Sequence, residues 1–151
     1  MILIINVCKH KLHFYEFVKP VGDILVKNNI KGFIRHYTCL TKKDLEKASK
    51  IIICGTALKD NDYLENIKKF SWLKDCKKPV LGICAGMQII GIISGHKLIK
   101  NKKIGVFNNK YYLHSFSVEG FGDELLIKNF RGYLFHPEVL NKDLVLEFAK
   151  A

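Results

Sequence analysis

The sequence predicts an α/β domain, a three-layer sandwich in which a mainly parallel central sheet has helices on both faces. Short apolar segments such as Ile2–Val7, Lys50–Cys54 and Val80–Ile83 are typical of strands that are buried on both faces. Helical patterns separate these segments, and such alternation favours parallel strands. After Gly95, shorter strand-like segments predict that a few antiparallel strands complete the C-terminal part.

In the first half of the chain, strands alternate with helices. The expected strands are Ile2–Val7, Gly32–Tyr37, Lys50–Cys54 and Val80–Ile83. A helical region interrupted by Pro20 follows the first strand. Thr41 and Asp44 have the spacing of a capping box, which predicts that a short helix begins there. Further helices are expected around residues 64–70, where one face is apolar, and over Ala85–Ser94.

The second half is expected to contain short strands and one last helix. The strand-like segments are Lys103–Phe107, Tyr111–Val118, Glu124–Ile127 and Gly132–Phe135. Asn141 can cap a final helix over Asp143–Lys150. No linker, repeat or low-complexity segment interrupts the chain, so residues 1–151 are expected to form a single domain.

The composition is that of an ordinary globular protein, with 151 residues of which 48% are hydrophobic and 26% are charged. No apolar run approaches the roughly 18 residues of a membrane span. Met1–Val7 is too short for a secretory signal and lacks a basic leader. The five cysteines are scattered without a C-x-x-C pair, which argues against a disulfide framework or a zinc site. We therefore expect a cytoplasmic protein with no membrane association, metal or cofactor.

The formal net charge of +11 comes from lysines that are spread along the whole chain. All of the 25 basic residues except Arg35 and Arg131 are lysines. Nucleic-acid binders usually concentrate their charge and use arginine for bidentate contacts, so no nucleic-acid partner is expected. The pattern favours a solvated surface. Docking to an acidic partner and weak polyanion binding are the alternatives.

Cys84 lies where an apolar strand turns into a helix. Gly82 and Gly86 flank it two residues before and two residues after, and small residues at these positions allow a sharp turn. This is the layout of a nucleophile elbow, in which the side chain points off the carboxyl edge of a sheet toward solvent. The N-terminus of the following helix favours a thiolate. A lone free cysteine is, however, often only a buried apolar residue.

A second segment near the C-terminus supplies a base and a carboxylate. Residues 135–138 read Phe-His-Pro-Glu, and in an extended segment His136 and Glu138 project to the same side. A cysteine nucleophile needs a base, and the base needs a group that orients it. A His-Pro pair alone is often only a turn. Together, Cys84, His136 and Glu138 indicate a catalytic triad by role.

These two segments resemble the defining motifs of class I (triad-type) glutamine amidotransferase domains. The motifs are Gly-Ile-Cys-Ala-Gly-Met-Gln at 82–88 and Phe-His-Pro-Glu at 135–138. The similarity spans nearly the whole chain and implies a flavodoxin-like fold. It also implies that Cys84 attacks the carboxamide carbon of glutamine, giving a γ-glutamyl thioester and ammonia, while His136 shuttles the proton and Glu138 orients His136.

The resemblance further implies a set of substrate-side residues. Gln88, one helical turn after the nucleophile, would help to hold glutamine. The segment Tyr-Leu-His-Ser-Phe at 112–116 resembles the family strand that lines the amino and carboxylate end of the substrate, which makes His114, Ser115 and Phe116 candidates. The His-Ser-aromatic motif at 114–116 is most similar to that of the imidazole-glycerol-phosphate synthase and anthranilate synthase types. The cysteine motif is shared with the GMP synthetase type.

The expected oxyanion hole departs from the family pattern. The backbone N–H of Ala85 is one expected donor, and the family usually takes the second from a Gly-Gly-Pro loop. Here that loop reads Gly55-Thr56-Ala57, so Gly55 and Thr56 are the remaining candidates. A non-glycine peptide flips less easily toward an oxyanion, and loss of one donor costs on the order of 10²–10³ in rate. The hypothesis is a low basal glutaminase that a partner activates.

The function expected from the resemblance is that of a glutaminase subunit that passes ammonia to a separate synthetase. No phosphate-binding loop is present, which implies that a partner chain binds the acceptor. The chain resembles a short version of the family domain, with a trimmed connection over Gly95–Lys110. Alternatives are a non-catalytic amidotransferase-like module that binds glutamine or a partner for regulation, and a γ-glutamyl hydrolase.

Overall fold

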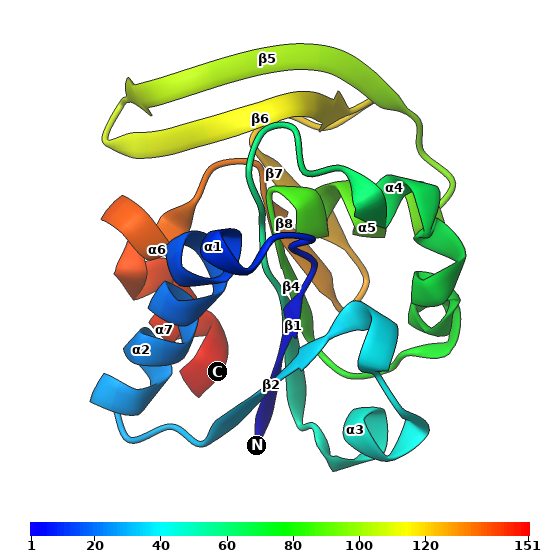
Figure 1. The fold of residues 1–151 in the computed structure, drawn as a ribbon, viewed down its shortest axis with the longest axis vertical. Coiled ribbons are helices and arrows are strands. Elements are labelled where there is room, and N and C mark those ends of the chain that lie inside the picture. The colour runs from blue at the N-terminus through cyan, green and yellow to red at the C-terminus, as the bar shows by residue number, and fades with distance from the viewer.

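A computed structural model describes all residues, 1–151, and contains a main sheet of six strands (Figure 1). Its strands are β1 (Ile2–Asn6), β2 (Gly32–His36), β3 (Lys50–Ile53), β4 (Val80–Ile83), β7 (Glu124–Ile127) and β8 (Phe130–Tyr133). They lie in the order β2-β1-β3-β4-β8-β7. All neighbours are parallel except β7, which runs antiparallel to β8. The predicted mainly parallel sheet with antiparallel C-terminal additions is confirmed.

A separate two-stranded hairpin crosses the end of the sheet where the parallel strands finish (Figure 1). It consists of β5 (Leu98–Phe107) and β6 (Lys110–Val118), which are antiparallel. Asn108 and Asn109 form its turn with φ of 50° and 60°, as asparagine tolerates in tight hairpins. The hairpin is tied to the main sheet by a hydrogen bond from the N–H of His136 to the carbonyl of Tyr111, at 2.8 Å.

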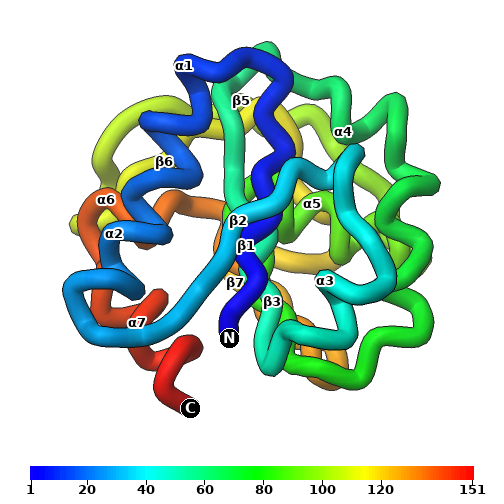
Figure 2. Tube along the Cα trace, turned by 60° about the horizontal axis from the view of Figure 1, so that its bottom comes forward, coloured from blue at the N-terminus to red at the C-terminus, as the bar shows by residue number.

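Helices cover both faces of the main sheet (Figure 2). One face carries α1 (Lys11–His13), the π-helical turn η1 (Phe14–Val18), α2 (Lys19–Lys27), α6 (Pro137–Leu140) and α7 (Lys142–Lys150). The other carries η2 (Tyr37–Cys39), α3 (Lys42–Lys47), α4 (Asp62–Glu65), η3 (Ile67–Asp75) and α5 (Ala85–Ile93). Alternate residues of β1 enter two separate apolar clusters, Leu3 and Ile5 on one face and Ile2 and Ile4 on the other. The three layers therefore follow the prediction.

Several element details differ from the predictions. Pro20 does not interrupt a helix but lies in the first turn of α2, where its missing N–H costs nothing. The single helix expected around residues 64–70 is the short α4 followed by the 3₁₀-helical η3. Asn141 precedes α7 without capping it, because its side-chain amide donates to the carbonyl of Asn109 at 3.2 Å.

The capping box at the start of α3 forms as predicted. The N–H of Asp44 donates to Oγ1 of Thr41 at 3.2 Å, and the N–H of Thr41 donates to Oδ2 of Asp44 at 3.0 Å. Strand bounds shift more after Gly95, since β5 begins at Leu98 rather than at the expected Lys103, and β8 begins at Phe130 rather than at the expected Gly132. Sequence patterns place strand centres better than strand ends.

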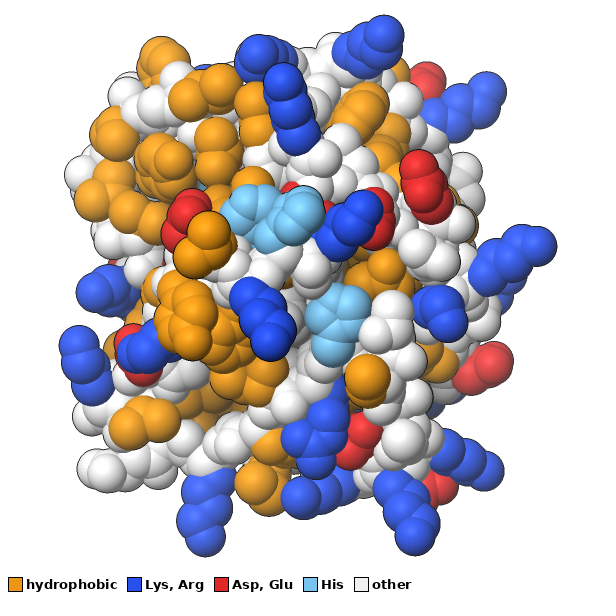
Figure 3. All heavy atoms as spheres, in the orientation of Figure 1, with side chains coloured by type: hydrophobic (Ala, Val, Ile, Leu, Met, Phe, Trp, Pro, Cys, Tyr) orange, Lys and Arg blue, Asp and Glu red, His pale blue; other side chains and the backbone are white.

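The surface view agrees with the interpretation of the charge as dispersed. Lysine and arginine side chains are scattered around the face in Figure 3, with apolar and acidic groups between them.

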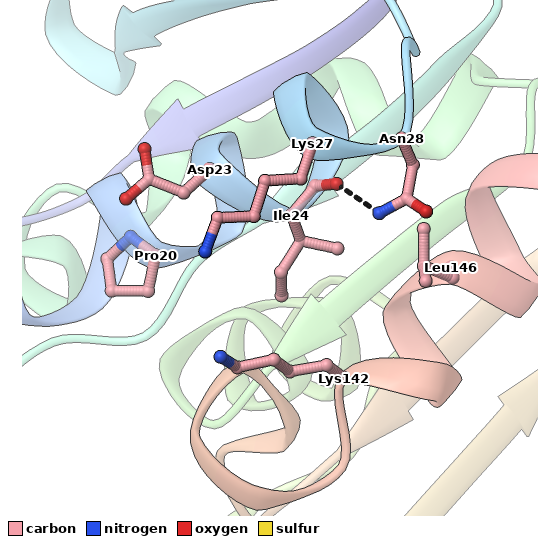
Figure 4. A pocket seen from close by; sticks show the side chains of 7 residues that line it. All are labelled: Pro20, Asp23, Ile24, Lys27, Asn28, Lys142 and Leu146. Carbon is pink, nitrogen blue, oxygen red and sulfur yellow. Dashed lines mark hydrogen bonds between the residues drawn. The ribbon is translucent and has the colours of Figure 1, made fainter.

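None of the helices combines the length and the apolar character that a membrane crossing demands. A cavity of about 220 Å³ lies between α2 and the start of α7 (Figure 4). None of the predicted site residues lines this cavity.

Candidate active site

Cys84 occupies the turn between β4 and α5 in a strained backbone conformation. Its φ of 50° and ψ of −100° lie outside the regions that residues other than glycine prefer. The N–H of Cys84 donates to the carbonyl of Tyr133 at 2.7 Å, which ties the turn to β8. A non-glycine residue in this conformation at the end of a buried strand is the geometry of a nucleophile elbow.

The glycines on either side of Cys84 let α5 pack directly on the sheet. A Cβ atom at Gly86 would lie 2.2 Å from the carbonyl oxygen of Ile53, and one at Gly82 would lie 2.5 Å from the carbonyl carbon of Gly86. Both neighbours are backbone atoms, which cannot move aside independently. The predicted need for small residues at these two positions is confirmed by this close approach.

Gly86→Ala is therefore expected to lower the free energy of unfolding by about 1–3 kcal/mol, because the new methyl group forces α5 away from β3. Urea denaturation followed by circular dichroism measures the change. Gly122→Ala is the matched control, since a Cβ at Gly122 meets no atom within 4 Å. Equal destabilisation by the two substitutions would contradict the packing argument.

The structure brings Cys84, His136 and Glu138 together. Nδ1 of His136 lies 3.3 Å from Oε2 of Glu138. On the other side of the ring, Nε2 of His136 and Sγ of Cys84 each lie 3.4 Å from the carbonyl oxygen of Leu113. The segment is not extended as predicted, because α6 begins at Pro137. Proline suits the first position of a helix, and the carboxylate reaches the imidazole from that first turn.

The three side chains are buried, which differs from the expectation that the thiol faces solvent. The exposed fractions are 3% for Cys84, 0% for His136 and 1% for Glu138. The reason is the hairpin, since β6 crosses the elbow and the thiol donates a hydrogen bond to the carbonyl of Leu113. The site is therefore closed over its nucleophile.

Charge inside this closed site favours a protonated His136. Burial by itself lowers the pKa of the imidazole, but the carboxylate of Glu138 and the thiolate of Cys84 outweigh it through charge and hydrogen bonds. The net effect raises the pKa of His136 well above its ordinary value. A protonated imidazole beside Cys84 is the group that can stabilise a thiolate, the form in which a cysteine is a nucleophile.

The loop after β3 lies against the imidazole. A Cβ at Gly55 would lie 2.6 Å from Cε1 of His136, so only glycine fits there without displacing the ring. The N–H groups of Gly55 and Thr56 donate to no backbone oxygen. Ala85 is the first residue of α5, and its N–H has no acceptor within the helix. These three predicted oxyanion-hole residues thus retain free donors around the elbow.

The predicted substrate-side residues lie in two different environments. Gln88 is buried, accepts a hydrogen bond from the Tyr63 hydroxyl at 2.6 Å and donates to the carbonyl of Phe116 at 3.1 Å. Its amide therefore links α5 to α4 and β6. Ser115 donates to the carbonyl of Leu58 at 3.3 Å, which ties β6 to the loop after β3.

His114 is directed toward β5. Its Nδ1 lies 2.7 Å from the carbonyl oxygen of Asn101, and Nε2 is buried without a partner. Burial lowers the pKa of His114, and the hydrogen bond to Asn101 offsets this only in part. A neutral imidazole that bonds the neighbouring strand stabilises the hairpin.

Several residues at the site were not predicted from the sequence. The backbone carbonyl of Leu113 covers the thiol, and the ring of Phe17 packs on His136 with centroids 5.2 Å apart. Asp60 accepts a hydrogen bond from Thr56 at 2.9 Å. The position of the Leu113 carbonyl leaves no signature in the sequence, and Phe17 fitted only a helical pattern. For Asp60, the one signal in the sequence was an acidic residue shortly after the Gly55-Thr56 loop.

Comparisons with known proteins agree with this geometry. The family model of class-I glutamine amidotransferases matches residues 14–150. The imidazole glycerol phosphate synthase subunit HisH 2 of Campylobacter jejuni is 26% identical over 147 residues, and the match covers 64% of this chain and 74% of the relative.

Solved structures share the fold. A Thermoplasma acidophilum protein, provisionally assigned as a GMP synthase subunit, has a TM-score of 0.79 and 16% identity, covering 99% of this chain and 92% of its own. A glutamine amidotransferase of Thermotoga maritima has a TM-score of 0.65 at 16% identity, with coverage of 99% and 89%. At these identities the likeness establishes the flavodoxin-like fold of such proteins.

Proposed function

This chain belongs to the glutamine amidotransferase class-I family, and we propose that it releases ammonia from the side-chain amide of glutamine through Cys84. The observation that carries the proposal is the buried contact of Cys84, His136 and Glu138 at a strained elbow. We further propose that residues 1–151 act as one domain and deliver ammonia to a separate synthase subunit. The likeness to subunits of imidazole glycerol phosphate synthase and GMP synthase supports such a partner.

In the proposed reaction, the Cys84 thiolate attacks the carboxamide carbon of glutamine. The carbonyl oxygen becomes an oxyanion, which accepts hydrogen bonds from the N–H of Ala85 and from the Gly55-Thr56 loop. The His136 imidazolium gives its proton to the leaving nitrogen, the C–N bond breaks, and ammonia and a γ-glutamyl thioester form. His136 then takes a proton from water, which attacks the thioester and releases glutamate and the thiolate.

Two features support a low activity of the chain alone. The Leu113 carbonyl lies 3.4 Å from Sγ of Cys84, so a substrate must displace β6 to reach the thiol. Thr56 and Ala57 also make the loop less free to rotate than glycines would. We propose that a synthase partner opens β6 and completes the oxyanion hole.

The isolated chain is expected to release ammonia from saturating glutamine slowly. Its rate should be at least about 10²-fold below the rate of the same site with a complete oxyanion hole. Coupling ammonia to glutamate dehydrogenase measures the rate, and added candidate synthase subunits should raise it. Full-speed hydrolysis by the isolated chain would contradict partner activation while supporting the glutaminase chemistry.

The closed site also gives a specific reason to test a non-catalytic role. A regulatory module would bind glutamine, measured by calorimetry, without releasing ammonia under any partner condition. A γ-glutamyl hydrolase would instead cleave γ-glutamyl peptides faster than glutamine. Rates for both substrates, measured with the same preparation, separate these two alternatives from the amidotransferase.

A further inference from the structure

Asp60 is a buried carboxylate outside the predicted triad. Its side chain has an exposed fraction of 0%. One oxygen, Oδ2, accepts hydrogen bonds from Oγ1 of Thr56 at 2.9 Å, from the N–H of Lys9 at 2.9 Å and from Nδ1 of His13 at 2.8 Å. Burial raises the pKa of Asp60, but the hydrogen bonds from His13, Lys9 and Thr56 outweigh it and hold the pKa below its ordinary value. The group is therefore an ionised acceptor.

Asp60 also closes, through its backbone, the loop that faces the nucleophile. The N–H of Asp60 donates to the carbonyl of Ala57 at 3.1 Å, which makes a turn directly after Thr56. At the other end of the loop, Gly55 lies against the imidazole of His136. Thr56, between these two points, is buried and has its hydroxyl committed to Asp60.

The same carboxylate connects the loop to the N-terminal helical segment. His13 ends α1, and Lys9 lies just before that helix. Phe17, in the π-helical turn that follows, packs on His136. The segment therefore contacts the loop through Asp60 and the base through Phe17. π-helical turns are frequent at functional sites because they place side chains that a regular helix cannot.

We propose that Asp60 is a positioning residue for the oxyanion hole. It holds Thr56 so that the Gly55-Thr56 loop keeps its free N–H groups beside Cys84, and it anchors that loop to α1 through His13. Asp60 touches no reacting atom in this scheme and acts through Thr56. The inference rests on the proposed glutaminase function and adds a residue to it.

Thr56→Val tests the proposal because valine keeps the shape of threonine and removes only the hydroxyl donor. We expect kcat for ammonia release to fall about 10- to 100-fold, since loss of one oxyanion donor costs up to about 10³-fold and a displaced donor costs less. KM should change less than about threefold, because ground-state binding is retained. Thr56→Ser should recover most of the lost kcat, and Asp60→Asn should resemble Thr56→Val.

Asp44→Asn is the matched control, since Asp44 is also a largely buried aspartate that accepts a hydrogen bond from a threonine, at the start of α3. It should lower Tm without changing kcat per folded molecule. An active wild type with unchanged kcat in Thr56→Val would overturn the positioning role alone. A wild type that releases no ammonia, alone or with a synthase subunit, would overturn the proposed function and this inference together.

Discussion

Cys84→Ala is expected to reduce glutamine hydrolysis to the background rate, a loss on the order of 10⁴–10⁶ in kcat. Without Sγ no thioester can form, while the oxyanion donors and the His136–Glu138 pair remain in place. The variant should keep its fold, because alanine fits the space of cysteine. Ammonia release measures the rate, and intact-protein mass spectrometry after incubation with glutamine should detect a γ-glutamyl adduct in the wild type only.

Other cysteines are poor alternatives for the nucleophile. Burial raises the pKa of Cys8 to about 11 and the pKa of Cys54 well above its ordinary value, so both remain neutral thiols near pH 7. Cys84 instead lies beside His136, since Sγ of Cys84 and Nε2 of His136 both approach the carbonyl oxygen of Leu113. Cys39 is exposed, and Cys39→Ala is the control that should retain the wild-type rate. Activity above one-hundredth of the wild type in Cys84→Ala would refute the assignment.

The elbow could be predicted from the sequence because its signals are local. Residues 80–93 contain the buried strand, the two glycines and the following helix in direct succession. Because these signals are adjacent in the sequence, together they indicate a single turn at Cys84. The pairing of Cys84 with His136 was predicted from the two motifs occurring together. Its structural basis was not predicted, because the segment before His136 was expected to be antiparallel, whereas β8 runs parallel beside β4 and ends at the same edge of the sheet.

The closed state of the site could not be predicted in the same way. It depends on where the β5–β6 hairpin crosses the elbow, which brings a carbonyl of Leu113 rather than a side chain onto the thiol. The Asp60 contacts likewise join residues 47 and 51 positions apart. Hydrophobic periodicity describes residues that are close along the chain. It therefore does not predict contacts between residues this far apart in the sequence.

Glu138→Gln is expected to lower kcat by about 10²–10⁴, because glutamine keeps the size of the side chain but no longer supports an imidazolium at Nδ1 of His136. KM should change little. The free energy of unfolding near pH 6 should fall by about 3 kcal/mol, as when a buried pair loses one partner. Glu147→Gln, on the exposed side of α7, is the control and should change neither quantity.

The pH dependence of stability distinguishes loss of charge from simple loss of packing. In the wild type the pKa of His136 is raised in the folded state. The contribution of His136 to the free energy of unfolding is therefore complete below its unfolded-state pKa of about 6.5. It is lost as the pH rises through its pKa in the folded state. Without the carboxylate, the largest cause that raises the pKa of His136 is removed, so the stability that a protonated His136 contributes at low pH becomes smaller. Urea unfolding between about pH 6 and 9 should show the difference in unfolding free energy between wild type and Glu138→Gln shrinking as the pH rises. Parallel curves would mean that Glu138 acts through packing and does not hold a charged His136.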